Sequence, residues 1–351
     1  NIDALCKSGM EFSMGYPGAA NCLPSRSCIM SGMYTPRTKM WQPGKVSKGE
    51  SSFMRFLVPN RLNRLGDGKI QTTNSLNPSV VSLAEMLKQV GYKTLHLGKW
   101  HLGHDGQGFD QHNTDGRGAG LKMDCKFYGN ENVAEWLTDA AVDYIADNKD
   151  APFFLYLCHW DVHVPLNARE NVVEKYQKKK DSKIWSQDWD PVYAAMVEAV
   201  DVSVGRVWQT LKENGIAENT LLIFTSDNGG FGGATWNSPL KGSKGGFYEG
   251  GIRVPLVMSW PGTIKPGTVC DTPVTGVDYM STFSELARAS LPDVKSQPQD
   301  GVSIVPLMKG KTISERAIYW HYPMYLSGRV QVKPIYGTDK MYWRATPCSI
   351  V

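Results

Sequence analysis

Amphipathic helical segments alternate with short apolar runs along this chain, and that alternation constrains the fold more than any other feature. Apolar runs at residues 94–97, 152–157, 221–224 and 254–259 have the length and composition of buried strands. Helical spacing of apolar residues marks residues 133–147 and 192–214, and a third helix follows Pro78, where Ser82 and Glu85 have capping-box spacing. Strands alternating with helices are typical of a parallel sheet covered on both faces. We therefore expect an α/β fold with a large, mostly parallel or mixed central sheet flanked by helices.

Polar side chains with catalytic potential follow three of the predicted strands. Lys99 and His101 follow the first, His159 and His163 the second, and Asp227 and Asn228 the third. Open α/β sheets bind ligands at the carboxyl ends of their strands. These three loops are therefore expected to converge on one site.

Length and charge exclude several classes of protein. The 351 residues exceed the roughly 250 at which single cores stop growing, so we expect one large domain plus a smaller part. No apolar run approaches the roughly 20 residues that a membrane span needs, so no membrane span is predicted. The net charge of +4 comes from dispersed Lys and Arg rather than a basic stripe, which argues against nucleic acid as a partner. Small anionic substrates stay open.

The seven cysteines are odd in number and show no C-x-x-C spacing. They are Cys6, Cys22, Cys28, Cys125, Cys158, Cys270 and Cys348. At least one must stay out of intramolecular pairing. For every cysteine except Cys22 an inert structural role is the expectation.

The most informative stretch is Asn21-Cys22-Leu23-Pro24-Ser25-Arg26-Ser27. Pro24 suits the first turn of a helix, which sets Cys22 beside the exposed N–H groups of a helix N-terminus. Anions bind well at such a position. A capped turn with a reactive or buried cysteine remains open on this stretch alone.

This stretch resembles the C-x-P-S-R signature of the formylglycine-dependent (type I) sulfatase family, which belongs to the alkaline phosphatase superfamily. Three further segments resemble the family in the same order: residues 91–103 with Gly98-Lys99-Trp100-His101-Leu102-Gly103, residues 226–230 with Ser226-Asp227-Asn228-Gly229-Gly230, and residues 244–255 with Lys244-Gly245-Gly246-Phe247-Tyr248-Glu249-Gly250-Gly251. Four ordered matches spanning about residues 1–262 far exceed what a single motif supports.

The resemblance implies a catalytic apparatus. Cys22 is implied to be oxidised to formylglycine, whose hydrate attacks sulfur with one hydroxyl and expels sulfate with the other. Calcium or magnesium is implied as the cation, held by Asp227, Asn228 and the modified Cys22, because hard cations prefer oxygen ligands. The remaining implied roles are sulfate binding for Lys99 and Lys244, steadying of the formylglycine for Arg26, proton removal from its hydroxyl for His101, and contact with the leaving oxygen for His163.

Several of these residues have ordinary alternatives. Isolated lysines are usually solvated, and Asp-Asn-Gly-Gly by itself favours a tight turn. For His159, a structural contact and a substrate contact are equally supported. Trp236 and Trp160 would suit a sugar ring, although core packing is the commoner role of a tryptophan. The basic residues of the polar excursion at residues 41–78 would suit a polyanion or a solvated loop; they are Lys45, Lys48, Arg55, Arg61, Arg64 and Lys69.

The resemblance also predicts the domain organisation. Residues 1–312 are expected to form the sulfatase catalytic α/β domain, without its N-terminal strand and the acidic metal-ligand pair that follows that strand. Residues 313–351 are expected to begin a smaller C-terminal subdomain that is largely truncated. A periplasmic, extracellular or lysosomal location and a formylglycine-generating maturation enzyme are implied by the family, while the oligomeric state stays unknown.

The sequence thus predicts a sulfuric ester hydrolase that releases inorganic sulfate, with a sulfated carbohydrate as the expected substrate and a sulfated small molecule as another possibility. Two alternatives stay open. One is a phosphate or phosphonate ester hydrolase of the same superfamily, which can share the formylglycine, the metal and the basic residues. The other is a non-catalytic binding protein.

Overall fold

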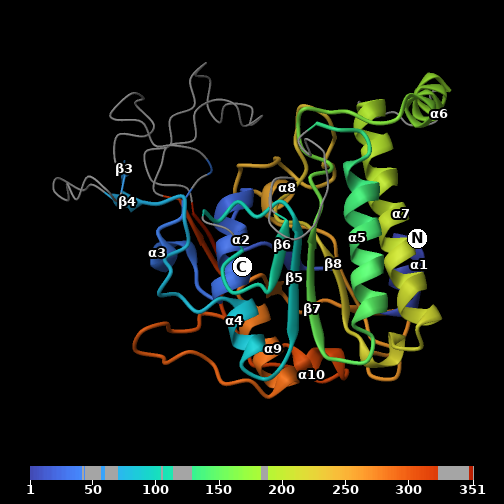
Figure 1. Cartoon of the computed structure of the whole chain (residues 1–351). Helices are drawn as coiled ribbons and strands as arrows, with labels where there is room; N and C mark the ends of the chain where they lie inside the picture. Colours follow the sequence, from blue (N-terminus) through green and yellow to red (C-terminus); the bar gives the residue numbers. More distant parts are fainter. Residues whose placement is uncertain are drawn as a thin grey trace.

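The structure is a computed structural model that describes residues 1–41, 43, 57–59, 70–103, 106–113, 129–182, 189–322 and 348–350. Strands occupy the centre, with α5 (Val133–Asp147) and α7 (Pro191–Glu213) on one side and α2 (Cys22–Ser31), α4 (Leu83–Lys88) and α9 (Asp278–Ala287) on the other (Figure 1). The expected α/β architecture is therefore confirmed.

The central strands form two hydrogen-bonded sheets. The first has the order β10 (Thr268–Cys270), β1 (Met10–Phe12), β9 (Leu256–Ser259), β8 (Leu222–Thr225) and is mixed, since β1 is parallel to β10 while β9 is antiparallel to both of its neighbours. The second has the order β6 (Gln111–Asn113), β5 (Lys93–Gly98), β7 (Phe153–Cys158) and is parallel throughout. Each of the four predicted apolar runs is a strand.

The predicted helices form where the sequence carries their signals. At the start of α4 the Ser82 hydroxyl accepts from the Glu85 amide and the Glu85 carboxylate accepts from the Ser82 amide, which completes the capping box. At the start of α7 the Asp190 carboxylate accepts from the amides of Val192 and Tyr193. Because these caps satisfy amides that lack helical partners, both helices begin at defined residues.

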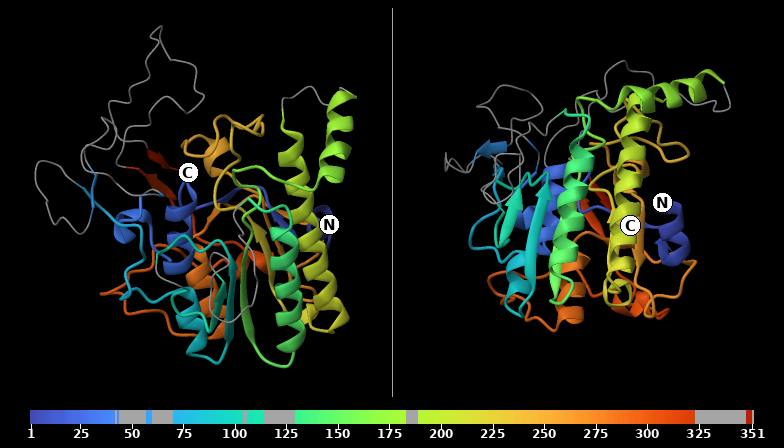
Figure 2. Two further views of the ribbon diagram at one scale, coloured as in Figure 1. Left: turned by 45° about the horizontal axis from the view of Figure 1, so that its top comes forward. Right: turned by 45° about the vertical axis from the view of Figure 1, so that its right-hand side comes forward.

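The remaining elements are smaller or peripheral. They are α1 (Ile2–Ser8), β2 (Gly15–Tyr16), α3 (Thr35–Thr38), β3 (Leu57–Pro59), β4 (Ile70–Thr72), α6 (Glu170–Asp181), the 3₁₀ helix Ala217–Asn219, α8 (Glu249–Ile252), β11 (Val274–Thr275), α10 (Val305–Met308), β12 (Tyr319–His321) and β13 (Cys348–Ile350). Helix α6 projects from the body at the end of the molecule where β7 finishes (Figures 1 and 2).

A small cluster of buried residues, separate from the packing around the two sheets, holds the segment that leads into β12. Trp320 packs with Tyr16, Ala20 and Ile252, and its indole N–H donates to the carbonyl of Pro17 at 2.7 Å. Because this carbonyl lies shortly before α2, the polypeptide around residue 320 is fastened directly to the segment that enters the central helix.

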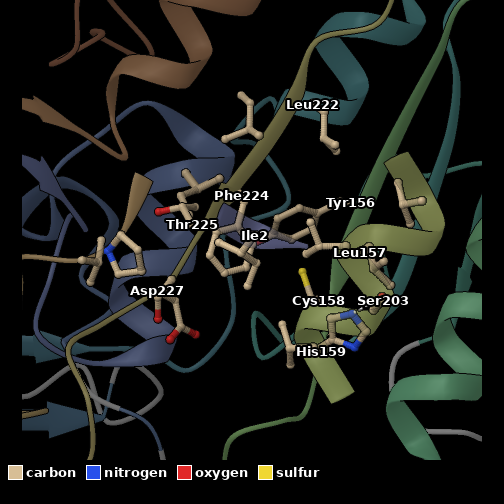
Figure 3. Close-up of a pocket in the computed structure, with 18 of the residues that line it drawn as sticks. Ile2, Tyr156, Leu157, Cys158, His159, Ser203, Leu222, Phe224, Thr225 and Asp227 are labelled. Atoms are coloured by element: carbon tan, nitrogen blue, oxygen red, sulfur yellow. Dashed lines mark hydrogen bonds between the residues drawn. The ribbon is translucent and has the colours of Figure 1, made fainter. Parts of the chain in front are cut away.

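A cavity of about 1790 Å³ separates the two sheets. Tyr156, Leu157 and Cys158 of β7 lie on one side of it, and Phe224 and Thr225 of β8 on the other (Figure 3). Among the described strands, β7 pairs only with β5 and β8 only with β9. All residues of β9 are buried, whereas those of β8 are half-buried. The single central sheet expected from the sequence is thus divided where no described strand joins β7 to β8.

Three further expectations concern membrane spans, the cysteines and the basic excursion. In the part of the chain that the structure describes, no helix has the length and apolarity of a membrane span. Five cysteines in the described parts carry free thiols: Cys6, Cys22, Cys28, Cys158 and Cys270. The six basic residues of the 41–78 excursion lie outside the described residues.

Candidate active site

Helix α2 brings Cys22 to the centre of the molecule. Cys22 is its first residue, only 2 % exposed, and follows an extended Asn21. The helix ends at Gly32, whose φ of 69° is the left-handed conformation that glycine adopts without strain. The prediction that Cys22 lies at a helix N-terminus is confirmed.

A buried ion pair joins α2 to the end of β8. The Arg26 Nε donates to the Asp227 Oδ2 at 2.7 Å, and both side chains are mostly buried. Arg26 also donates to the carbonyl of Lys99. Although burial opposes both charges, the mutual attraction raises the pKa of Arg26 and, with help from Lys99, lowers that of Asp227. One guanidinium thus ties together the three segments that carry Cys22, Lys99 and Asp227.

The loop after β5 carries Lys99 and His101. Burial lowers the pKa of Lys99, and the nearby charge of Arg26 acts in the same direction. Burial, then the charges of Lys99 and Arg26, lower the pKa of His101 to about 4, so that its imidazole is neutral near pH 7. His101 Nδ1 is buried and has no hydrogen-bond partner among the described residues.

Lys244 reaches the site through backbone contacts of its own loop. The amide of Gly245 donates to the carbonyl of Ala20 at 2.8 Å, and the amide of Lys244 donates to the carbonyl of Gly230 at 3.0 Å. The first bond fixes the Lys244 loop beside the turn that precedes Cys22. The second fixes it beside the loop that follows Asn228.

The two histidines after β7 have different environments. His163 shares the electrostatic environment of Lys99, Lys244 and Asp227, and burial and Lys99 lower its pKa. His159 instead contacts Ser203 of α7, with 2.9 Å between its Nε2 and the hydroxyl oxygen, and burial alone lowers its pKa to about 4. Figure 3 shows His159 and Ser203 together on the α7 side of the cavity, with Asp227 on the opposite side.

Together, the charged side chains at this site form an environment that favours anions. The Asp227 carboxylate lies in the field of three cations, Arg26, Lys99 and Lys244, and Lys99 interacts electrostatically with both Asp227 and Cys22. One carboxylate neutralises only part of this charge. The site therefore favours a ligand with negative charge on several oxygens, held next to residue 22.

Asn228 adds an oxygen that lacks a protein partner. Its Nδ2 donates to the carbonyl of Gly229, while its Oδ1 is buried and has no hydrogen-bond partner among the described residues. A buried amide oxygen in this state fits a cation ligand, beside the Asp227 carboxylate. In the described part of the chain no three His, Cys, Asp or Glu side chains form a cluster able to hold a metal. The described donor set fits a hard cation but is partial.

The sequence-predicted residues fall into two groups. The first group shares one electrostatic environment and consists of Cys22, Arg26, Lys99, His101, His163, Asp227 and Lys244. Asn228 follows Asp227 directly, whereas His159 contacts Ser203 and Trp236 is 55 % exposed on the loop before Lys244. Sequence reasoning missed Ser203, which lies 44 residues from His159, and Phe231, which lines the same cavity as Lys244 and Asp227.

Comparison with solved structures identifies the class of protein. The structure of Ps i-CgsB in complex with k-i-k-neocarrahexaose superposes with a TM-score of 0.73 and 28 % sequence identity, over 92 % of this chain and 73 % of that chain. The α/β sheet with its site at the strand ends therefore defines a protein of the alkaline phosphatase superfamily.

Sequence comparison gives the family. The family model described as Sulfatase matches residues 1–289, and the model described as N-sulphoglucosamine sulphohydrolase, C-terminal, matches residues 243–345. A sulfatase of Formosa agariphila is 32 % identical, over 94 % of this chain and 70 % of its own length. The chain belongs to the sulfatase family, as the sequence motifs predicted.

The relatives are longer than this chain. An arylsulfatase of Hemicentrotus pulcherrimus is 28 % identical over 92 % of this chain, which spans 59 % of that protein. The residues matched by the Sulfatase family model, 1–289, include all the site residues described above, because these lie between residues 22 and 244.

Proposed function

We propose that the protein hydrolyses sulfate esters of a carbohydrate and releases inorganic sulfate. The observation that carries this proposal is a group of three cations around Asp227 and near Cys22, made of the buried Arg26 and Lys99 and the half-buried Lys244. A sulfuryl group spreads negative charge over its oxygens, and preorganised cations stabilise such charge best where water is excluded. Family membership and the glycan bound to the Ps i-CgsB relative support a sulfated glycan as the substrate class.

Cys22 is proposed to be matured to formylglycine by a formylglycine-generating enzyme. When hydrated, formylglycine supplies the nucleophile for sulfur and a second hydroxyl for release of sulfate. Lys99 and Lys244 bind the sulfate oxygens. Arg26 lies on the same helix as residue 22 and, through its ion pair, positions Asp227 relative to that residue. His101 is neutral near pH 7 because its pKa is about 4, so its imidazole can accept a proton from a hydroxyl at residue 22.

His163 is the proposed proton donor to the leaving oxygen, because it lies within the field of Lys99 and Asp227 and is only half-buried. Trp236 is proposed to contact the sugar. For His159 the contact with Ser203 supports the structural alternative, and a substrate contact at this residue stays a prediction.

A calcium or magnesium ion is proposed to be held by Asp227, Asn228 and the modified residue 22. The partnerless Asn228 Oδ1 and the ionised Asp227 carboxylate support this assignment. Such a cation supplies positive charge for a sulfate oxygen and for the hydroxyl of residue 22. The protein's own part is to keep Asp227 ionised, which Arg26 does through its hydrogen bond to Oδ2.

The catalytic unit is proposed to comprise residues 1–312, followed by the start of a smaller subdomain at residues 313–351. We further propose that the cavity between β7 and β8 takes a strand that precedes Asn1. Among the described strands, β7 and β8 each leave one edge unpaired, and apolar side chains such as Leu157 and Phe224 are only half-buried. Both features support this proposal, because unpaired backbone groups and exposed apolar surface raise the free energy of the folded state. Hydrogen exchange of the β7 and β8 amides tests this proposal. We expect exchange to be slow in a chain extended at its N-terminus and fast in a chain without the extension.

Two substrate panels test the proposed function. The matured protein is assayed for sulfate release from sulfated galactan, fucan and glycosaminoglycan oligosaccharides and from 4-nitrophenyl sulfate, and for turnover of the matching phosphate mono- and diesters. We expect kcat/KM to be highest on a sulfated oligosaccharide. A higher kcat/KM on a phosphodiester would replace the proposal with phosphoester hydrolysis, and the absence of turnover on both panels would favour a binding protein.

The cellular location is proposed to be periplasmic, extracellular or lysosomal, where sulfated glycans are met. Fractionation of cells that express the complete protein tests it, with activity in a cytoplasmic fraction as the opposing result.

A further inference from the structure

The loop between Asn228 and Lys244 presents two aromatic rings to solvent. Phe231 is 43 % exposed and Trp236 is 55 % exposed. Phe231 lines the same cavity as Asp227 and Lys244. Exposed aromatic side chains lose favourable burial, so two of them on one loop beside an anion-binding site need a physical reason.

The backbone holds Phe231 in a fixed turn. The amides of Ala234 and Thr235 both donate to the carbonyl of Phe231 at 3.0 Å, and the carbonyl of Ala234 accepts from the amide of Asp190 at the start of α7. The phenyl ring lies against Gly233, since a Cβ at that position would stand 2.7 Å from a ring carbon. The ring therefore has a defined place against the backbone although much of it is exposed.

A side-chain brace links this turn to the sulfate-binding lysine. The Asn237 Nδ2 donates to the carbonyl of Gly230 at 3.1 Å and to that of Gly242 at 3.2 Å. The same Gly230 carbonyl accepts from the amide of Lys244. Because one carbonyl connects the residue before Phe231 to Lys244, the backbone at these two residues is held together.

We propose that Phe231 forms an aromatic wall that packs against the apolar C–H face of a sugar ring in the substrate. This inference rests on the proposed function, because it assigns the part of the substrate that carries the sulfate. A pyranose ring presents C–H groups on its faces and hydroxyls at its rim, so a flat aromatic surface matches a face and leaves the hydroxyls solvated. A ring whose backbone is held to that of Lys244 would orient the sugar while the lysine holds the sulfate.

This wall is a specificity device rather than part of the reaction. It makes contact with a ring-shaped alcohol and gives little to a short alkyl sulfate. Its contribution should fall mainly on KM, because the contact is made equally in the bound substrate and in the transition state.

Three variants of the matured protein test the wall. Phe231→Leu keeps an apolar side chain but removes the flat face, and Phe231→Tyr keeps the face. Tyr319→Leu is the matched control, because Tyr319 is a 52 % exposed aromatic residue of β12 that does not line the cavity. The readout is kcat and KM on the best sulfated oligosaccharide, on a short alkyl sulfate and on 4-nitrophenyl sulfate, with melting temperatures to verify folding.

For Phe231→Leu we expect the ratio of kcat/KM on the oligosaccharide to that on the short alkyl sulfate to fall by about three- to tenfold, mainly through KM. Phe231→Tyr and Tyr319→Leu should keep the ratio within about twofold of the wild type. If Phe231→Leu keeps the ratio while the wild type uses the oligosaccharide, the wall is refuted and the proposed function stands. If the wild type releases sulfate only from the aryl ester, the glycan substrate and the wall are refuted together.

Discussion

Helices α2 and α6 show how differently this protein treats two helices of similar length. All ten residues of α2 are buried, including Arg26 and the serines, whereas none of the twelve residues of α6 is buried. In α2 several polar groups find partners inside the protein, as when the Ser31 hydroxyl donates to the carbonyl of Ser27 at 2.6 Å. In α6 the charged groups pair at the surface, as when Lys175 donates to Glu198.

The same type of ion pair therefore has a different energetic meaning in each helix. The side chains of Arg26 and Asp227 are 8 % and 18 % exposed, while those of Arg169, the N-cap of α6, and Glu135 are 49 % and 48 % exposed. Breaking a buried pair leaves an uncompensated charge in the protein, whereas water replaces a partner at the surface. The comparison teaches that the residues of α2 proposed to serve the active site are fixed by the core, whereas no residue of α6 is buried in it.

The largest effect is expected at the first residue of α2. Cys22→Ala should reduce turnover at least about 10⁴-fold, because no other described residue can supply the formylglycine nucleophile. The melting temperature should change little, since alanine lacks only the sulfur of the unmodified cysteine or the oxygen atoms of the proposed formylglycine. Cys6→Ala is the matched control, being a half-buried cysteine of α1 outside the site. Sulfate release measured by ion chromatography would contradict the assignment if Cys22→Ala retained turnover.

The two arginines provide the direct test of the comparison. Arg26→Ala should destabilise the protein by about 3–5 kcal/mol, because Asp227 would be left buried without its partner. Arg169→Ala should cost about 0–1 kcal/mol. Urea denaturation of both variants measures the difference. Equal losses would mean that burial does not distinguish the two helices, and the comparison would fail.

A smaller and more selective effect is expected at His163, in the loop that leads from β7 to α6. His163→Ala should lower kcat on an alkyl or sugar sulfate by about 10²-fold and kcat on 4-nitrophenyl sulfate much less, because a good leaving group needs no proton. The kcat ratio between the two substrates is the measurement. Equal losses on both would remove the proton-donor role from His163.

Lowering the pH should reduce the free energy of unfolding through a buried histidine of the core, and no such effect is expected from α6. His96 of β5 is fully buried against Trp100 and Tyr156, and burial lowers its pKa to about 3. The folded state therefore favours neutral imidazole. This contribution to stability is complete above the unfolded pKa of about 6.5 and is lost as the pH falls from there toward 3, with a slope approaching about 1.4 kcal/mol per pH unit. Unfolding free energies from pH 7 to 4 should show a shallower slope in His96→Phe than in the wild type, and an unchanged slope would contradict the assignment.

The smallest effect is expected on α6. Lys178→Ala combined with Lys179→Ala should change the free energy of unfolding by less than about 0.5 kcal/mol per residue, because neither side chain is buried. Turnover of the sulfated oligosaccharide should stay within about twofold of the wild type. A clear rise in KM on longer oligosaccharides, with the aryl sulfate unaffected, would instead extend the substrate-binding surface to α6.

Local signals in the sequence predicted most of the regular elements. The bounds of α5 were predicted correctly because one apolar face repeats with helical spacing across all 15 residues. The convergence of Lys99, His101 and Asp227 was predicted because strands of an α/β sheet end at a common edge. Both arguments need only neighbours in the sequence and a general rule of packing.

Contacts that depend on distant partners were not predictable in this way. The pairing of His159 with Ser203 depends on how α7 lies against β7, and periodicity gives the face of a helix but not its register against a strand. The division between β7 and β8 likewise requires the strand order. Phe231 stood in a Gly-rich turn, where the sequence gives no signal that a ring is exposed beside Lys244.

The complete burial of α2 also sets an order of events in the making of this protein. The maturation proposed for Cys22 would require an enzyme to take the polypeptide around this residue into its own active site, yet Cys22 is 2 % exposed and all ten residues of α2 are buried. The folded molecule would therefore offer such an enzyme no substrate. The proposed oxidation of this thiol thus belongs to the interval before the helix closes into the core, and a chain that folds first would keep an unmodified cysteine.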